Sequence, residues 1–156
     1  MKICLLVVGR TVEKYFIAAI EEYVERTRHY IPFEMEVIPE LKNTKSLSES
    51  QQKEREADLL LRAFQPGDFI VLLDEHGKEF RSTEFAMWID KKMQQVPRRL
   101  VFVIGGSYGL GDDVLRRSNF ALSFSKLTFP HQLMRVLFCE QLYRCARINS
   151  GQKYHK

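Results

Sequence analysis

The 156-residue sequence is poor in cysteine and has no long apolar run. Its three cysteines, Cys4, Cys139 and Cys145, show no Cys-x-x-Cys spacing and lie among apolar residues. We therefore expect reduced thiols in a cytosolic protein, with neither a disulfide framework nor a zinc site. Apolar runs such as Ile3–Val8 are five or six residues long, whereas a helix needs roughly 20 to span a bilayer. The amino-terminal segment has no basic flank followed by a long apolar core, so we expect no secretory signal.

The composition is otherwise that of a globular protein. Apolar residues make up 45% of the chain and charged residues 28%, which excludes a disordered or fibrous protein. The length predicts one domain over residues 1–156. The net charge of +4 is unevenly spread, because residues 1–97 carry 14 basic and 17 acidic side chains while residues 98–156 carry 10 and 3. The basic last third favours an anionic partner, with nucleic acid as one possibility.

Apolar periodicity predicts buried strands that alternate with amphipathic helices. The strands are expected at residues 2–8, 33–38, 69–73, 100–104 and 120–123. The helices are expected at residues 11–30, 48–64, 82–96, from 112 onward, and 131–148. Alternating apolar and acidic residues mark the second strand as an edge strand. Buried strands separated by helices favour a parallel sheet covered by helices, so the predicted fold class is α/β.

Local signals set several of these boundaries. Thr11 is expected to cap the first helix. Ser48, with Gln51 three residues later, resembles a capping box for the second. The polar residues 74–78 are expected to form a loop after the third strand, and residues 41–50 another loop.

A glycine-rich segment, GGSYGLG at residues 105–111, follows the fourth strand. Glycines after a parallel strand let backbone N–H groups approach a ligand closely at the carboxyl edge of the sheet. The segment is not a P-loop, because no Gly-Lys-Ser/Thr closes it, and Val114 stands where a dinucleotide fingerprint has its third glycine. A plain turn before a helix that is capped by Asp112 is the alternative interpretation.

The stretch FSKLTFPH at residues 124–131 has no regular period and lies between a strand and the last helix. Its backbone groups would line a pocket for an adenine-like ring, with Leu127 and Phe129 as apolar walls. Pro130 would fix the entry into the helix. A plain connector is the alternative interpretation.

The last helix is apolar on more than one face, so we expect it to pack on the sheet and on a further surface such as a second subunit. Arg135 lies among these apolar residues, where an unpaired charge is costly, so a carboxylate or phosphate partner is expected. The tail, residues 153–156 (KYHK), either frays in solvent or contacts RNA. No metal site is expected, because His29 and His76 have no carboxylate or cysteine at a metal-ligand spacing.

Six segments carry a resemblance to a known family: MKICLLVVGR, FEMEVIP, LLDEHGK, VFVIGGSYGL, ALSFSKLTFPHQLMRVLFCEQLYRCARI and the terminal YHK. They are similar to the RlmH family, the ribosomal large-subunit RNA pseudouridine N3-methyltransferases of the SPOUT class, from Met1 to Lys156. The resemblance implies an α/β fold with a C-terminal trefoil knot. It also implies a cytoplasmic homodimer with active sites at the subunit interface, and S-adenosylmethionine bound in the knot.

The resemblance also implies site residues. The cofactor contacts would be Leu73, Gly105, Gly106, Phe124, Ser125, Lys126, Leu127, Thr128 and Phe129. Methylation of N3 removes its proton, so a base of near-neutral pKa is needed. His155 is the first candidate and His131 the second. Tyr154 would stack on a base in the RNA, and Arg135 would stabilise the N3 anion.

The implied partner is ribosomal RNA in the assembled ribosome, with no membrane and no metal. Phosphate contacts are expected from the basic end of the chain: Arg98, Arg99, Arg116, Arg117, Lys126, Arg144, Arg147, Lys153 and Lys156. Two alternatives remain open. One is a SPOUT enzyme that acts on transfer RNA, and the other is a non-catalytic α/β module that binds RNA or a nucleotide.

Overall fold

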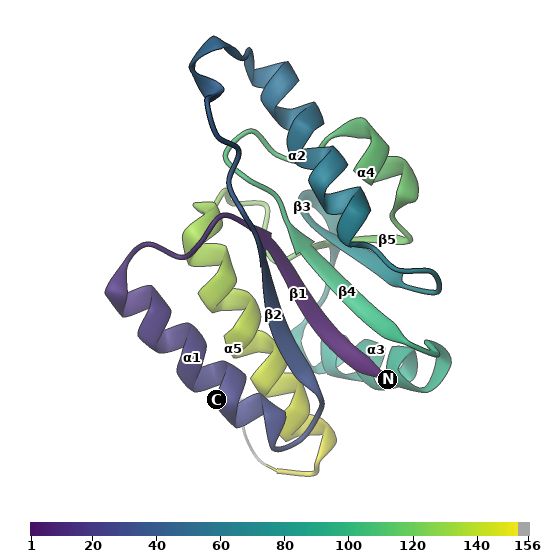
Figure 1. Cartoon of the computed structure of the whole chain (residues 1–156). Coiled ribbons are helices and arrows are strands. Elements are labelled where there is room, and N and C mark those ends of the chain that lie inside the picture. Colours follow the sequence, from purple (N-terminus) through teal and green to yellow (C-terminus); the bar gives the residue numbers. More distant parts are fainter. Residues whose placement is uncertain (153–156) are drawn as a thin grey trace.

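The computed structural model describes residues 1–152, which form a five-stranded parallel sheet with helices on both faces (Figure 1). The strands are β1 (Lys2–Val8), β2 (Phe33–Ile38), β3 (Phe69–Glu79), β4 (Arg99–Ile104) and β5 (Phe120–Ser123). The helices are α1 (Lys14–Arg28), α2 (Glu49–Ala63), α3 (Ser82–Gln95), α4 (Asp112–Arg117) and α5 (His131–Asn149), with a 3-10 turn at Thr44–Ser46. The strand order is β2-β1-β4-β3-β5. The predicted α/β class and the edge position of β2 are confirmed.

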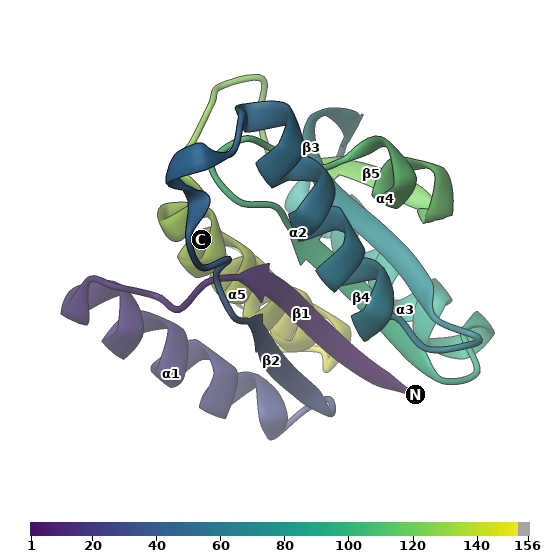
Figure 2. The same ribbon diagram turned by 45° about the horizontal axis from the view of Figure 1, so that its top comes forward.

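Side chains of the central strands alternate between two apolar cores, one on each face of the sheet. Leu5 and Phe102 belong to the core that packs against α1, α3 and α5. Leu6 and Val101 belong to the core that packs against α2 and α4. All six residues of β4 are buried, as expected for a central parallel strand covered on both faces. Because all strands run the same way, the segments that follow β3, β4 and β5 meet at one edge of the sheet (Figure 2).

The polar residues 74–78 are not the simple loop that the sequence predicted, because β3 continues to Glu79. Leu73 pairs with Leu122 of β5, and after a register shift Lys78 pairs with the same residue. Residues 74–77 therefore bulge out of the sheet at its carboxyl edge. Gly77 makes the close approach possible, since a Cβ there would lie 2.6 Å from the Ala121 carbonyl carbon.

Two helix starts differ from their predicted form. Thr11 does not cap α1, whose N-cap is Glu13 without a side-chain cap hydrogen bond. The Thr11 hydroxyl instead accepts a hydrogen bond from Arg135 at 3.1 Å. Gly111, not Asp112, is the N-cap of α4.

The capping box of α2 is confirmed. The Gln51 N–H donates to Ser48 Oγ at 3.1 Å, and the Ser48 N–H donates to Gln51 Oε1 at 2.9 Å. This reciprocal pair satisfies two N–H groups that a helix start leaves free. It fixes where α2 begins, within the segment that was expected to be a loop.

Helix α5 packs between α1 and α3 as well as on the sheet, which accounts for much of its broad apolar surface. Phe138 and Leu142 are fully buried, whereas Leu133 and Leu137 stay half-buried. Among residues 1–152, no helix has the length and apolarity needed to cross a membrane.

Candidate functional site

A pocket of about 980 Å³ lies at the carboxyl ends of β3, β4 and β5. Its walls come from the bulge of β3, the glycine segment 105–111, the loop 124–130 and the first turn of α5. Eight of the nine predicted cofactor residues line it: Leu73, Gly105, Gly106, Phe124, Ser125, Leu127, Thr128 and Phe129. The ninth, Lys126, is exposed and lies outside the lining.

The glycine segment forms a tight loop that leaves no room for side chains at its start. The Gly109 N–H donates to the Gly106 carbonyl at 3.1 Å, and Gly109 has a φ of 83°, which glycine adopts without strain. A Cβ on Gly105 would lie 2.9 Å from Leu110 Cδ2. The loop therefore presents its backbone to the pocket.

Helix α2 forms the support behind this loop. A Cβ on Gly106 would lie 2.5 Å from Glu56 Oε1, and one on Gly111 would lie 2.8 Å from the Ala57 Cβ. Glu56 is only 6% exposed, and within the described chain its Oε2 has no hydrogen-bond partner. Burial, with a smaller contribution from the charge of Glu40, raises the pKa of the Glu56 carboxyl. Burial against the loop backbone therefore disfavours the charged form of this carboxyl.

The loop 124–130 is held at both ends. The Phe124 ring stacks on Phe138 of α5, with ring centroids 6.2 Å apart. The Thr128 hydroxyl donates to Glu75 Oε2 of the β3 bulge at 3.0 Å. Between these anchors, Leu127 is 71% exposed. An exposed apolar residue of this size beside a pocket is available to a ligand or a partner.

His131 lines the pocket as the first residue of α5. Burial, followed by the positive charge of Arg135, lowers the pKa of the His131 imidazole. The imidazole is therefore neutral at pH 7, the form that accepts a proton.

Arg135 is fully buried and is not among the residues that line the pocket. Its guanidinium donates to the Val8 carbonyl at 2.8 Å and to the Thr11 hydroxyl. The expected carboxylate or phosphate partner is thus replaced by a carbonyl and a hydroxyl. Burial lowers the pKa of Arg135, partly offset by Glu40. In this position Arg135 ties α5 to the end of β1 and acts on the pocket through His131.

Tyr154 and His155 lie outside the described residues, as do Lys153 and Lys156.

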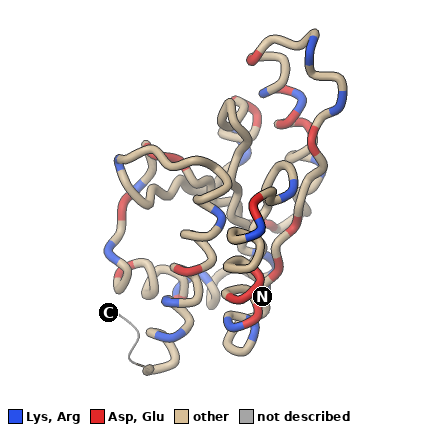
Figure 3. Tube along the Cα trace, turned by 90° about the vertical axis from the view of Figure 1, so that its left-hand side faces the viewer, with Lys and Arg blue, Asp and Glu red and all other residues tan. Residues whose placement is uncertain are grey.

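Basic and acidic positions are interleaved along the chain in Figure 3. Three of the arginines expected to contact phosphate pair internally: Arg99 with Asp68, Arg116 with Asp113, and Arg144 with Glu140. Arg99 is only 8% exposed, so its proposed phosphate contact is wrong.

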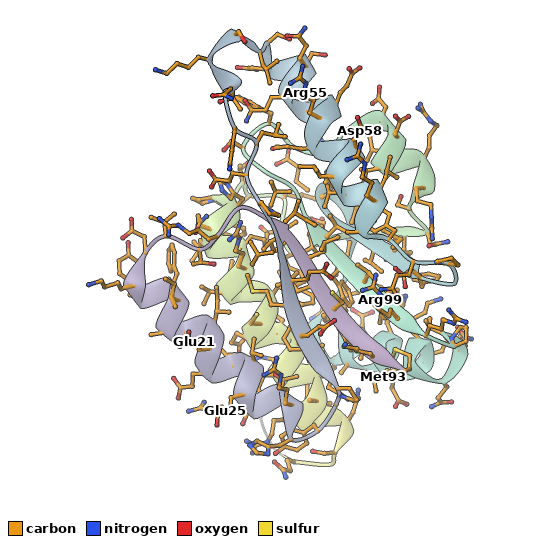
Figure 4. The ribbon with its side chains drawn as sticks, viewed as in Figure 1. Glu21, Glu25, Arg55, Asp58, Met93 and Arg99 are labelled. Carbon is orange, nitrogen blue, oxygen red and sulfur yellow. The ribbon has the colours of Figure 1, made fainter. Side chains whose placement is uncertain are left out.

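Cys4, Glu34 and Glu36 offer one atom each within 4.8 Å of one another, near the amino-terminal ends of β1 and β2. Lys2 Nζ lies 2.9 Å from Glu34. Arg99, which is labelled in Figure 4, lies 3.7 Å from Glu36. Burial raises the pKa of the Cys4 thiol to about 12. Each of the two carboxylates is therefore already paired with a basic side chain, and the Cys4 thiol stays protonated. This chemistry does not favour a metal ion.

Sequence reasoning missed Lys53 and Glu56 of α2, which border the pocket and its loop. The spacing of Lys53, Glu56, Ala57 and Leu60 places them on one helix face. The signal in the sequence was Glu56, an acidic residue on the apolar face of an amphipathic helix, where a charge is costly to bury.

The whole chain is similar to known methyltransferases. Residues 1–155 match a family model described as "Predicted SPOUT methyltransferase". The "Ribosomal RNA large subunit methyltransferase H" of Phocaeicola vulgatus is 60% identical over 155 residues, 99% of each chain. The protein of the same name from Christiangramia forsetii is 48% identical, also over 99% of each chain.

Solved structures support the same fold. A probable methyltransferase from Bordetella pertussis matches with a TM-score of 0.55 and 11% identity, over 93% of this chain and 94% of that chain. A probable methylase family protein from Haemophilus influenzae matches with a TM-score of 0.53 and 11% identity, over 99% of this chain and 70% of that one.

Proposed function

The chain belongs to the SPOUT methyltransferase family, and we propose that it methylates N3 of a pseudouridine in large-subunit ribosomal RNA, with S-adenosylmethionine as the methyl donor. Relatives that are 60% and 48% identical are named as ribosomal RNA large-subunit methyltransferases. The observation that carries the proposal is the pocket at the carboxyl edge of the sheet, which gathers eight of the nine proposed cofactor residues.

The pocket residues fit this cofactor. The volume of about 980 Å³ is at the upper end of the roughly 300–1,000 Å³ typical of ligand pockets. The glycines at 105 and 106 expose backbone groups that suit the adenine and ribose, and Leu73, Leu127 and Phe129 supply apolar walls. When bound, S-adenosylmethionine would supply an electrophilic methyl group on sulfur, to which N3 bonds in line as the carbon–sulfur bond breaks.

The protein's own contribution is to orient the base, exclude water and accept the N3 proton. The imidazole of His131 or His155 is suited to accept the N3 proton. Tyr154 would stack on a base of the RNA. The position of His131 in the pocket wall supports it as the base. Burial and, to a smaller extent, the charge of Arg135 lower the pKa of its imidazole and so favour the neutral form.

We expect His131→Asn to lower the single-turnover rate of methyl transfer by about 10²- to 10⁴-fold, the range for loss of a general base. Because the pKa of His131 is lowered from the ordinary value for histidine, the wild-type rate should fall on the acid side with a midpoint below about pH 6.5. The pH–rate profile with saturating cofactor measures this. An inflection at about 6.5, with His131→Asn still active and His155→Ala inactive, would assign the base to His155.

A second copy of the chain would complete the site. Leu133 and Leu137 lie one turn apart on α5 and are half-buried, and Leu127 in the pocket wall is exposed. These accessible apolar side chains support a homodimer. The single SPOUT domain over residues 1–156 and its trefoil knot follow from family membership and stay predictions. Relatives that are 60% and 48% identical are named as ribosomal RNA large-subunit methyltransferases, and we propose the assembled cytoplasmic ribosome as the substrate.

Two measurements test the proposal. S-adenosylmethionine at 100 times its Kd should stabilise the fold by about 2.7 kcal/mol and raise the Tm, whereas NAD, FMN and ATP should not. Radiolabelled methyl groups should enter ribosomes and not transfer RNA. Label in transfer RNA alone would favour a SPOUT enzyme that acts on transfer RNA. Cofactor binding without methyl transfer to either RNA would favour a non-catalytic module.

A further inference from the structure

Lys53 is the one Lys or Arg side chain among the described residues that line the pocket. It comes from α2, in the part of the chain where acidic side chains outnumber basic ones, and not from the basic last third. Within residues 1–152 no carboxylate pairs with it. A half-buried cation without a partner at a pocket wall is free to bind an anion.

The other charged groups in the lining are already engaged. Glu75 accepts a hydrogen bond from the Thr128 hydroxyl at 3.0 Å, and Asp74 Oδ1 accepts one from the His76 N–H at 3.1 Å. Both acids lie on the β3 side of the pocket. A polyanion approaching the mouth is therefore repelled on the β3 side and attracted on the α2 side.

The position of Lys53 is set by contacts between α2 and the glycine loop. The Lys53 carbonyl lies 3.3 Å from the place of a Cβ on Gly111, and the Glu56 carboxyl lies against Gly106, one turn further along α2. Burial raises the pKa of that carboxyl, and among residues 1–152 Glu56 forms no ion pair with Lys53. The backbone of Lys53 is thus fixed to the loop, while its side chain reaches the pocket.

We propose that the Lys53 ammonium binds an RNA phosphate next to the target nucleotide and so orients the target base in the pocket. This inference rests on the proposed methyltransferase function. Phosphate is the favoured anion because the segment that leads into α2 carries exposed cations at Lys42 and Lys45. Phosphate contacts fix the register of a protein on a nucleic acid without reading its sequence.

The test compares Lys53→Met, Lys53→Arg and Arg55→Met as purified full-length proteins. Arg55 is exposed on the outer side of the same helix and does not line the pocket (Figure 4), which makes it the matched control. We expect Lys53→Met to bind ribosomes about 10-fold more weakly, the size of one charge-assisted hydrogen bond. The slope of log affinity against log salt should become shallower by about 0.7, the value for one phosphate contact on a single strand. Lys53→Arg should keep most of the affinity, and Arg55→Met should match the wild type.

Cofactor affinity, measured by calorimetry without RNA, should not change in Lys53→Met. A loss of cofactor affinity would overturn the proposal, because Lys53 would then bind the carboxylate of the cofactor. Equal losses in Lys53→Met and Arg55→Met would also overturn it, since they would indicate general attraction and not a contact at the pocket. If Lys53→Met does not fold, Lys53→Gln takes its place. A wild-type protein that methylates no ribosomal RNA would instead refute the proposed function.

Discussion

Gly106→Ala is expected to weaken S-adenosylmethionine binding by roughly 5- to 150-fold, which corresponds to about 1–3 kcal/mol of overpacking. The new Cβ would lie 2.5 Å from Glu56 Oε1 and 2.9 Å from Oε2. Either the carboxyl group moves or the glycine loop shifts into the pocket. Because Glu56 is only 6% exposed, its carboxyl has little room to move, and α2 is packed on the loop at Gly111 as well, so we expect the loop to shift. Isothermal titration of the cofactor measures the loss.

A second substitution, at Glu56, should relieve the clash. Glu56→Ala removes the carboxyl that the new methyl group meets, so the double variant Gly106→Ala/Glu56→Ala should recover most of the cofactor affinity. The coupling energy of this double-mutant cycle isolates the contact between the two residues. If Gly106→Ala binds the cofactor as the wild type does, the glycine loop is not the cofactor wall that we propose.

Gly77→Ala should give the largest loss of stability among the glycine variants. Its Cβ would lie 2.6 Å from the Ala121 carbonyl carbon and 2.7 Å from the Leu122 nitrogen. Both are backbone atoms of β5, so no side chain can rotate away, and β3 must separate from β5. We expect the free energy of unfolding to fall by about 3 kcal/mol, which lowers the Tm by roughly 6–12 °C for a chain of this size.

Chemical denaturation at fixed protein concentration measures this change, because a dimer makes stability concentration-dependent. His76→Ala is the control, since its side chain is 84% exposed and a substitution of an exposed side chain within the same bulge should stay within about 0.5 kcal/mol of the wild type. Equal stability of Gly77→Ala and His76→Ala would mean that the bulge of β3 accommodates a side chain.

Much of this site was predictable from the sequence because its parts follow strands. Parallel strands bring their carboxyl ends to one edge, so the glycines after β4 and the irregular stretch after β5 had to meet there. The capping box at Ser48 and Gln51 was equally local. The roles of individual pocket residues came from the family resemblance and not from periodicity.

The missed features depend on contacts that are distant in the chain. Arg135 was correctly expected to need a partner, but that partner is the carbonyl of Val8, 127 positions earlier. Residues 74–77 look like a loop, and they form a bulge only because the flanking residues Leu73 and Lys78 both pair with β5. Lys53 reaches the pocket because α2 docks on Gly106 and Gly111, and no local pattern predicts that docking.

The measurement that tests the central claim most directly is to locate the methyl group after reaction with assembled ribosomes. The purified protein, S-adenosylmethionine and ribosomes from a strain that lacks this activity would be incubated together. The large-subunit RNA would then be digested and analysed by mass spectrometry. We predict one new methyl group, on N3 of a pseudouridine, with little transfer to naked large-subunit RNA. A methyl group on another atom or nucleotide, or none despite bound cofactor, would contradict the account.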